Sequence, residues 1–241
     1  MEENWITALA AAMGFGVLGT TLGGVLGVAL GTPKERTLAC VLNATAGLMI
    51  AVVCFELLPE AYALHASFGV LGLILGVFAM MLGDAVVARR MEKTDGMARA
   101  GLLLAAGVAL HNLPEGLAVG SGYAHAPQLG VALALMIALH DVPEGLAAAV
   151  PMRVSGASVP RVLLITALSG VPTGLGALLG LAAGGVSQQV IALSLGFAGG
   201  AMLQVTAQEL LPRAGEMITD ARTTLCLALG VAAGSIVALY I

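Results

Sequence analysis

The chain has 241 residues, of which 59% are apolar and 10% charged, and its mean hydropathy is +1.00. This composition excludes a soluble globular protein, because too few polar side chains remain to cover a surface in water. The net charge of −4 comes without a basic cluster, so we expect membrane lipid as the surroundings and no nucleic-acid partner.

Eight apolar stretches are each long enough to cross about 30 Å of hydrocarbon as a helix. They cover residues 6–30, 37–64, 66–89, 98–123, 127–152, 158–182, 186–212 and 221–241. The start of the chain lacks the basic region of a signal peptide, so the first stretch is expected to be retained as a span. Because every connection is short, residues 1–241 are predicted to form one all-α transmembrane domain.

All ten Lys and Arg residues fall after an odd-numbered stretch or at the edges of the gap that follows it. They are Lys34, Arg36, Arg89, Arg90, Lys93, Arg99, Arg153, Arg161, Arg213 and Arg222. Cytoplasmic loops of membrane proteins retain positive charge. The pattern therefore predicts eight spans with both termini outside.

The first and last thirds of the chain resemble each other. Residues 47–61 match residues 200–214 at eight of fifteen positions, including a shared Glu-Leu-Leu-Pro. Five spans lie between corresponding helices, an odd number, so the two copies are predicted to be inverted in the membrane. Helices 1–3 would thus repeat as helices 6–8 around helices 4 and 5. The alternative is that Ala, Leu and Gly match through composition alone.

The three cysteines, Cys40, Cys54 and Cys226, lie inside apolar stretches and form no CxxC pair. We expect them to be packing residues, with neither a disulfide framework nor a thiolate metal site.

Two near-copies of one motif stand in the middle of the fourth and fifth stretches, HNLPEGLA at 111–118 and HDVPEGLA at 140–147. Residues four apart share a helix face, so each histidine stacks with the glutamate of its own motif. The residue after each histidine points about 100° round the helix, toward an adjacent site. The polar residues of the two motifs are His111, Asn112, Glu115, His140, Asp141 and Glu144.

Three of these residues are carboxylates, and each costs on the order of 2.5–3.5 kcal/mol at the centre of a bilayer. No Lys or Arg lies in the middle of a span to offset that cost. Two imidazoles, three carboxylates and an amide suit a divalent ion such as Zn²⁺, with Fe²⁺, Mn²⁺, Co²⁺ and Cd²⁺ as further candidates. The ion is expected to be cargo, and no cofactor is expected.

The paired motifs, the eight spans and the outside termini resemble the ZIP family of divalent metal transporters, in its bacterial branch. The resemblance implies zinc uptake across the plasma (bacterial inner) membrane, through a midplane metal centre on helices 4 and 5 that comprises the six polar motif residues. It implies that Met49 reaches this centre and that Glu56 and Glu209 lie on the ion pathway, and Glu60 at the outer end of helix 2 could collect cations. It also suggests that helices 1, 4, 5 and 6 move as a block against helices 2, 3, 7 and 8.

The sequence departs from the family pattern in the sixth stretch. Where the family often has a glutamate that joins a second metal, this chain has Thr173. A first site on His111, Glu115, His140 and Glu144 is therefore better supported than a second on Asn112 and Asp141. Two other functions stay open: a proton-coupled carrier or channel for another small solute, and an intramembrane metalloenzyme, although the chain has HxxxE and not HExxH. The sequence also leaves open a homodimer.

Overall fold

The computed structural model describes residues 2–90, 96–125, 127–182 and 187–240, and almost all of them are helical. The elements are α1 (Glu2–Leu30), α2 (Glu35–Val52), the π-helical turn η1 (Val53–Leu57), α3 (Leu58–Arg90), α4 (Gly96–His125), α5 (Pro127–Val154), α6 (Val159–Ala182), α7 (Gln188–Val205), the π-helical turn η2 (Thr206–Leu210), α8 (Leu211–Met217) and α9 (Ala221–Tyr240). The prediction of an all-α fold is confirmed for this part of the chain.

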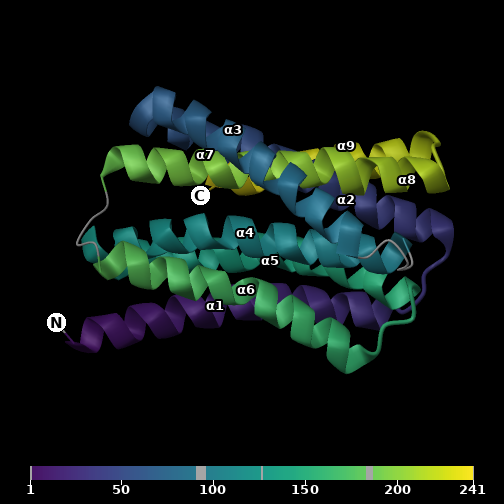
Figure 1. Ribbon diagram of the computed structural model, residues 1–241, viewed down its shortest axis with the longest axis horizontal. Helices are drawn as coiled ribbons and strands as arrows, with labels where there is room; N and C mark the ends of the chain where they lie inside the picture. The colour runs from purple at the N-terminus through teal and green to yellow at the C-terminus, as the bar shows by residue number, and fades with distance from the viewer. Residues whose placement is uncertain (1, 91–95, 126, 183–186, 241) are drawn as a thin grey trace.

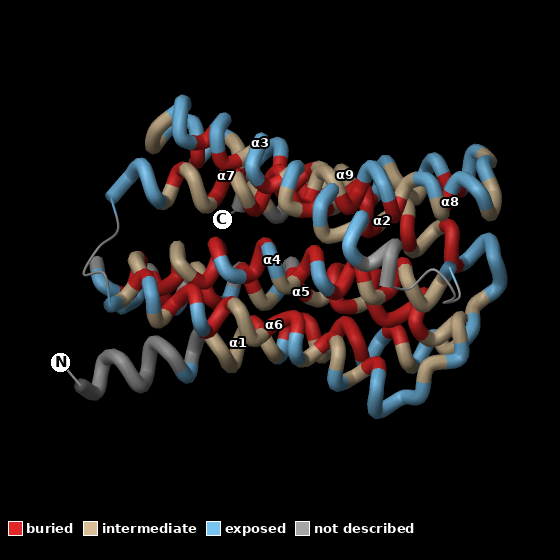
Figure 2. The backbone as a smooth tube through the Cα atoms, viewed as in Figure 1, coloured by how far each residue is buried: buried red, intermediate tan, exposed pale blue. Residues whose placement is uncertain are grey.

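The helices lie in two layers (Figure 1). One layer contains α1, α4, α5 and α6, and within it α4 packs along α6, α1 along α5, and α4 along α5. The other contains α2, α3, α7, α8 and α9, with α3 along α7 and α2 along α9. Buried side chains concentrate where the layers face each other (Figure 2), for example Leu42 and Met202 in one layer and Leu104 and Ala148 in the other.

The long helical run from Glu35 to Val86 spans 52 residues and is apolar enough to cross a membrane. It is interrupted at His65, whose backbone (φ −166°, ψ 97°) is extended and not helical. The predicted boundary between residues 64 and 66 lies at this break. A membrane helix needs about 20 residues, so the run is long enough for two crossings.

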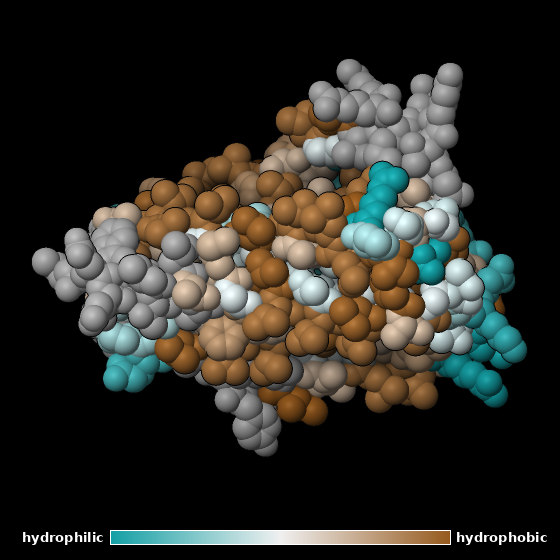
Figure 3. All heavy atoms as spheres, turned by 90° about the horizontal axis from the view of Figure 1, so that it is seen from below, coloured by the Kyte–Doolittle hydropathy of each residue, from teal (hydrophilic) through white to brown (hydrophobic). Residues whose placement is uncertain are grey.

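Six helical segments of the described chain are long and apolar enough to span a membrane, and Ala221–Ile236 is a shorter apolar helix. The space-filling view shows apolar residues over most of one face, with hydrophilic residues mainly toward the ends (Figure 3). The chain is therefore a multi-pass membrane protein, while the count of eight spans stays a prediction.

Glycines allow the helices to touch backbone to backbone at the two repeated motifs. A Cβ on Gly116 of α4 would lie 1.9 Å from the Thr173 carbonyl oxygen of α6, and one on Gly145 of α5 would lie 2.1 Å from the Thr20 carbonyl oxygen of α1. No side chain fits at such distances, so the glycine after each motif glutamate is required for close helix packing.

The two π-helical turns begin at Val53 and Thr206, 153 residues apart, which is the offset between the matching sequence segments. In each turn a backbone N–H donates five residues back, from Leu58 to Val53 and from Leu211 to Thr206. A proline follows each of these leucines and has no N–H of its own, which weakens the α-helical pattern there. These turns were not predicted from the sequence.

Basic residues gather at one end of the bundle, at the right of Figure 1, where α1 joins α2, α5 joins α6 and α8 joins α9. The basic residues at or next to these connections are Lys34, Arg36, Arg153, Arg161, Arg213 and Arg222. The first turn of α4 adds Arg99, which pairs with the last part of α3. Lys93 and the side chains of Arg89 and Arg90 lie outside the described part of the structure.

Candidate metal centre

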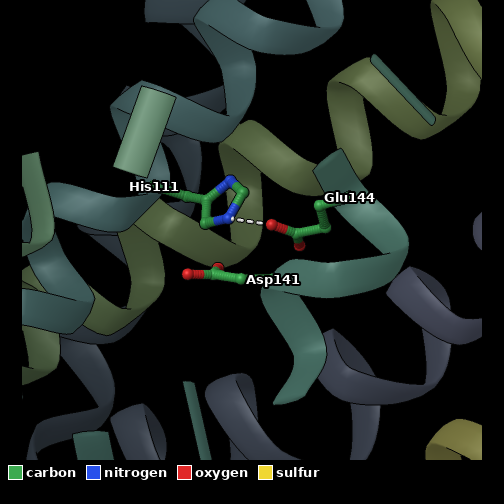
Figure 4. A group of neighbouring side chains, drawn as sticks. All are labelled: His111, Asp141 and Glu144. Carbon is green, nitrogen blue, oxygen red and sulfur yellow. Dashed lines mark hydrogen bonds and ion pairs between the residues drawn. The ribbon is translucent and has the colours of Figure 1, made fainter. Parts of the chain in front are cut away.

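The polar residues of the two motifs meet inside the protein where α4 and α5 run side by side. Helix α4 supplies His111, Asn112 and Glu115, while α5 supplies Asp141 and Glu144, and all five are buried. The close-up shows His111 and Glu144 pointing toward each other, with Asp141 beside them (Figure 4). The two motifs therefore contribute to one cluster.

The imidazole of His111 is held from both sides. Its Nδ1 lies 3.1 Å from the Gly107 carbonyl oxygen, one helical turn back, and its Nε2 lies 2.6 Å from Glu144 Oε2. A carbonyl oxygen only accepts, so Nδ1 must carry a proton and donate it. Nε2 then faces a carboxylate oxygen, and these two atoms approach so closely because they share a proton in a hydrogen bond; an ion bound by both groups would move them further apart.

This arrangement matches the usual surroundings of a histidine metal ligand. Such a histidine generally donates its other ring N–H to a carbonyl or carboxylate, which fixes the ring orientation and the tautomer. Both His111 and Glu144 are only 1% exposed, so water contributes little to neutralising the carboxylate. A cation at this position would stabilise the buried charge.

Asp141 completes a set of three ligand groups. Suitable ligand atoms of His111, Asp141 and Glu144 all lie within 4.8 Å of one another. Two atoms that bind the same Zn²⁺ at about 2.1 Å can be roughly 4.2 Å apart at most. Small side-chain rotations would therefore bring the three groups onto one ion. Glu144 Oε1 has no hydrogen-bond partner in the described part of the structure, so it is available as a ligand.

Glu115 lies one turn beyond His111 and borders a cavity of about 670 Å³. The same cavity is lined by Glu56, Glu60 and Ser121, and otherwise mostly by apolar side chains. Glu60 is exposed and Glu56 half-buried. The cavity thus connects predicted pathway carboxylates with the buried centre. Ser121 was not predicted as a site residue, although its hydroxyl in an apolar helix is visible in the sequence.

Asn112 turns away from this cavity toward α6. Its Nδ2 donates to the Ser169 carbonyl oxygen at 2.9 Å, and its Oδ1 has no hydrogen-bond partner in the described residues. Thr173, which stands where the family often has a glutamate, is buried, and its Oγ1 also has no such partner. This side of the centre contains neutral oxygens from Asn112 and Thr173, and the predicted second metal site remains a prediction.

Met49 lies beside the cluster. It lines a small cavity of about 10 Å³ together with His111, Glu144 and Met202. The Met49 sulfur accepts a weak hydrogen bond from Thr206 Oγ1 at 3.7 Å, and Thr206 is the first residue of η2. The contribution of Thr206 was not predicted, because it depends on how α7 is rotated against α2.

Glu209 lies further toward the basic end and is paired with Arg213, with 2.9 Å between Glu209 Oε2 and Arg213 Nε. It lines a second cavity of about 10 Å³ with Asp84 and two glutamines, Gln204 and Gln208. These glutamines are one helical turn apart in an otherwise apolar segment. This spacing is visible in the sequence, but the two glutamines were not predicted as site residues.

Asp84 also joins the two layers. Its Oδ1 accepts a hydrogen bond from Arg99 Nη2 at 2.7 Å, so α3 is tied to the start of α4. The partner that the structure describes is Arg99, fifteen residues away in sequence.

His140 belongs to α5 next to Asp141, but its side chain lies outside the described part of the structure. Its role as a ligand therefore stays a prediction.

Comparison with known proteins gives the family. A profile of the ZIP zinc transporters matches residues 87–239, more than half of the chain. Proteins named zinc transporter ZupT from Escherichia fergusonii and from Escherichia coli strains O127:H6 and K12 are 35% identical over 126 residues, which is 47% of this chain and 47% of each relative. The chain thus spans about half the length of the curated relatives it matches. The extent of the profile match establishes that the chain belongs to the ZIP zinc transporter family.

Proposed function

We propose that this protein transports a divalent metal ion, with zinc as the principal cargo, into the cell across the bacterial inner membrane. The observation that carries the proposal is the buried cluster of His111, Asp141 and Glu144 between α4 and α5. The ligand set consists of one imidazole, which a backbone carbonyl orients, and two carboxylates. Zinc prefers ligands of these kinds. Family membership agrees with a transporter and not an enzyme.

The ion binds near the bilayer midplane, where His111 and Glu144 form the centre with Asp141 and Glu115. His140 is the proposed further ligand, because it occupies the position in the second motif that His111 has in the first. Met49 borders the centre from α2 and offers a soft thioether ligand. Asn112 belongs to a weaker second position, since Thr173 provides no charge there.

The ion reaches the centre through the cavity of about 670 Å³, past Glu60 and Glu56 to Glu115. On the other side the layers are joined by the Asp84–Arg99 ion pair, and Glu209 is occupied by Arg213. Release toward the basic end therefore requires the two layers to separate there. Glu209 then takes over the ion after Arg213 moves away.

The proposed topology has eight crossings, in a single domain, with both termini outside and the basic end in the cytoplasm. The break at His65 divides the 52-residue segment into two crossings, and α9 provides the last. Positive charge at one end supports this orientation.

The inverted repeat is supported by the helix contacts. The repeat pairs α1 with α6, α2 with α7 and α3 with α9, and it pairs α4 with α5. When each helix is replaced by its counterpart, the α4–α6 contact becomes α5–α1 and the α3–α7 contact becomes α9–α2, and both of these contacts are present. The π-helical turns occupy equivalent positions and contain the pathway residues Glu56 and Glu209. A symmetric transporter with its site at the centre follows this plan.

A proton-coupled carrier of another small solute would also contain buried carboxylates, and zinc flux distinguishes the two. The purified protein in liposomes should take up zinc in a saturable manner, with entrapped indicator dye as the readout. Uptake should depend on Glu144, whereas a substitution at the exposed Glu216 should leave it unchanged. Saturable zinc uptake that is the same in protein-free liposomes, or in the Glu144→Gln variant, would reject the proposal.

A further inference from the structure

Helices α2 and α9 pack in register and very closely. A Cβ on Gly230 would lie 2.0 Å from the Ala44 carbonyl oxygen, and one on Gly234 would lie 2.8 Å from the Leu48 carbonyl oxygen. Both contacts join residues 186 apart in sequence, so the two helices run parallel with constant register. One turn earlier, the same register places Cys226 opposite Cys40.

The two thiols do meet across this interface. The side chain of Cys226 is within hydrogen-bonding reach of Cys40, and both residues are half-buried. Arg36 precedes Cys40 in sequence and Asp220 precedes Cys226. These two residues form an ion pair, with 3.0 Å between Arg36 Nη2 and Asp220 Oδ2. Both charged groups act electrostatically on Cys40. The sequence predicted packing residues, and it did not predict that Cys40 and Cys226 lie side by side.

We propose that Cys40 and Cys226 form a two-thiol binding site for a thiophilic divalent cation of the Zn²⁺ and Cd²⁺ type, separate from the α4–α5 centre. On binding, each thiol releases its proton to solvent and both sulfurs become thiolate ligands of the ion, so that one M²⁺ replaces two protons. Water supplies the remaining oxygen ligands, and the Asp220 carboxylate adds a negative charge that acts on Cys40.

Binding of an ion requires a smaller approach of the two sulfurs than a disulfide does. Two thiolates at about 2.3 Å from one tetrahedral ion lie roughly 3.8 Å apart, which is a typical separation for sulfurs in hydrogen-bonding reach. A disulfide requires the sulfurs to approach to about 2.05 Å and both side chains to take a restricted torsion. Coordination therefore requires the smaller movement.

The surroundings of the pair act in both directions. The neighbouring Cys226, burial and the Asp220 carboxylate disfavour a thiolate at Cys40, whereas the Arg36 guanidinium favours it, so the incoming divalent ion itself must displace the protons. Packing alone does not require two thiols at such a place. In the proposed repeat the corresponding residues are Leu193 and Gly72, and they also touch, since a Cβ on Gly72 would lie 2.1 Å from the Leu193 carbonyl oxygen.

The site does not rest on the proposed transport function, and the test keeps the two apart. The chain has three cysteines, so Cys54→Ser leaves the pair as its only thiols. Purified Cys54→Ser protein is titrated with Cd²⁺ in detergent, with a phosphine reductant that keeps the thiols reduced. The readout is the ultraviolet charge-transfer band of cadmium–thiolate bonds, which histidine and carboxylate ligands do not produce.

We expect the band to saturate at about one Cd²⁺ per chain, because the two sulfurs share one ion. It should vanish when Cys40→Ser or Cys226→Ser is added, and it should persist when Glu144→Gln disables the α4–α5 centre. In parallel, Cd²⁺ should slow maleimide labelling of Cys40 and Cys226. This measurement needs no substitution in the pair itself.

Absence of the band and of labelling protection in monodisperse Cys54→Ser protein would overturn the proposal. A band that survives in either serine variant would do the same, because it would come from one thiol only. Loss of the band in the Glu144→Gln variant would place the thiol ligands in the transport pathway and also contradict a separate site.

Discussion

Glu144→Gln is the substitution that isolates the charge of the metal centre. Glutamine has nearly the same shape as glutamate and can still hydrogen-bond to the imidazole of His111, which lies 2.6 Å from Glu144 Oε2. The side chain is almost fully buried, so the substitution leaves no cavity and removes one negative charge from the ion's surroundings. We therefore expect a folded protein with an impaired site.

The size of the effect follows from the proposed role of Glu144 as a direct ligand. Loss of a residue that merely orients a ligand weakens metal binding about 10–100-fold. Loss of a ligand should cost at least the upper value, about 100-fold, or roughly 2.8 kcal/mol. Initial zinc uptake into proteoliposomes, measured against zinc concentration, should show a KM raised by that factor or no saturable uptake at all.

The matched control is Glu216→Gln, because Glu216 is an exposed glutamate near the basic end. It removes the same charge and should leave KM within about twofold, since exposed charges at such distances are screened. If Glu144→Gln protein is monodisperse and its KM equals that of the wild type, the ligand role derived from the His111–Glu144 contact is wrong.

Three further predictions concern pH and packing. Protons compete with a divalent ion for imidazole and carboxylate ligands, so apparent zinc affinity should weaken from about pH 7.5 to 5.5; uptake titrations with the proton gradient collapsed test this, and constant affinity contradicts it. Gly116→Ala should destabilise the protein by about 1–3 kcal/mol, because the new methyl group meets the Thr173 backbone. The control, Gly83→Ala, places its methyl group in open space and should be neutral or stabilising. Thermal melts measure both effects. The pKa of Asp220 lies below its usual 3.8, mainly because the Thr223 backbone N–H donates to it. That stabilisation is present above about pH 4 and lost as the pH falls through the lowered pKa, so the melting temperatures of wild type and Asp220→Asn should differ at pH 7, and the difference should shrink as the pH falls below 3.8.

The helices and their approximate ends could be predicted because they depend on local properties of the chain. An apolar stretch of about 20 residues must form its backbone hydrogen bonds within itself when it lies in lipid. The break at His65 fell where the sequence placed a boundary between two stretches. The π-helical turns at Val53 and Thr206 were not predictable in this way, since a helix with an extra residue in one turn has the same hydropathy as a regular one.

The polar motifs also identified the centre, but not its contacts. Spacing of four residues indicated that His111 and Glu115 share a face of one helix. The closest partner of the His111 imidazole is instead Glu144 on the neighbouring helix. Which side chains face each other across two helices depends on the rotation and relative shift of those helices, and no spacing within one helix determines either quantity.

The sequence by itself determined that this chain belongs in a membrane, which segments are helical and which polar residues stand in the middle of apolar helices. These conclusions follow from composition and from periodicity over a few turns. Only the tertiary structure decided that Asp84 pairs with Arg99, that Thr206 contacts Met49 and that Cys40 meets Cys226. Each pair joins residues on different helices, and glycines such as Gly230 set how closely those helices approach through contacts that depend on the whole bundle.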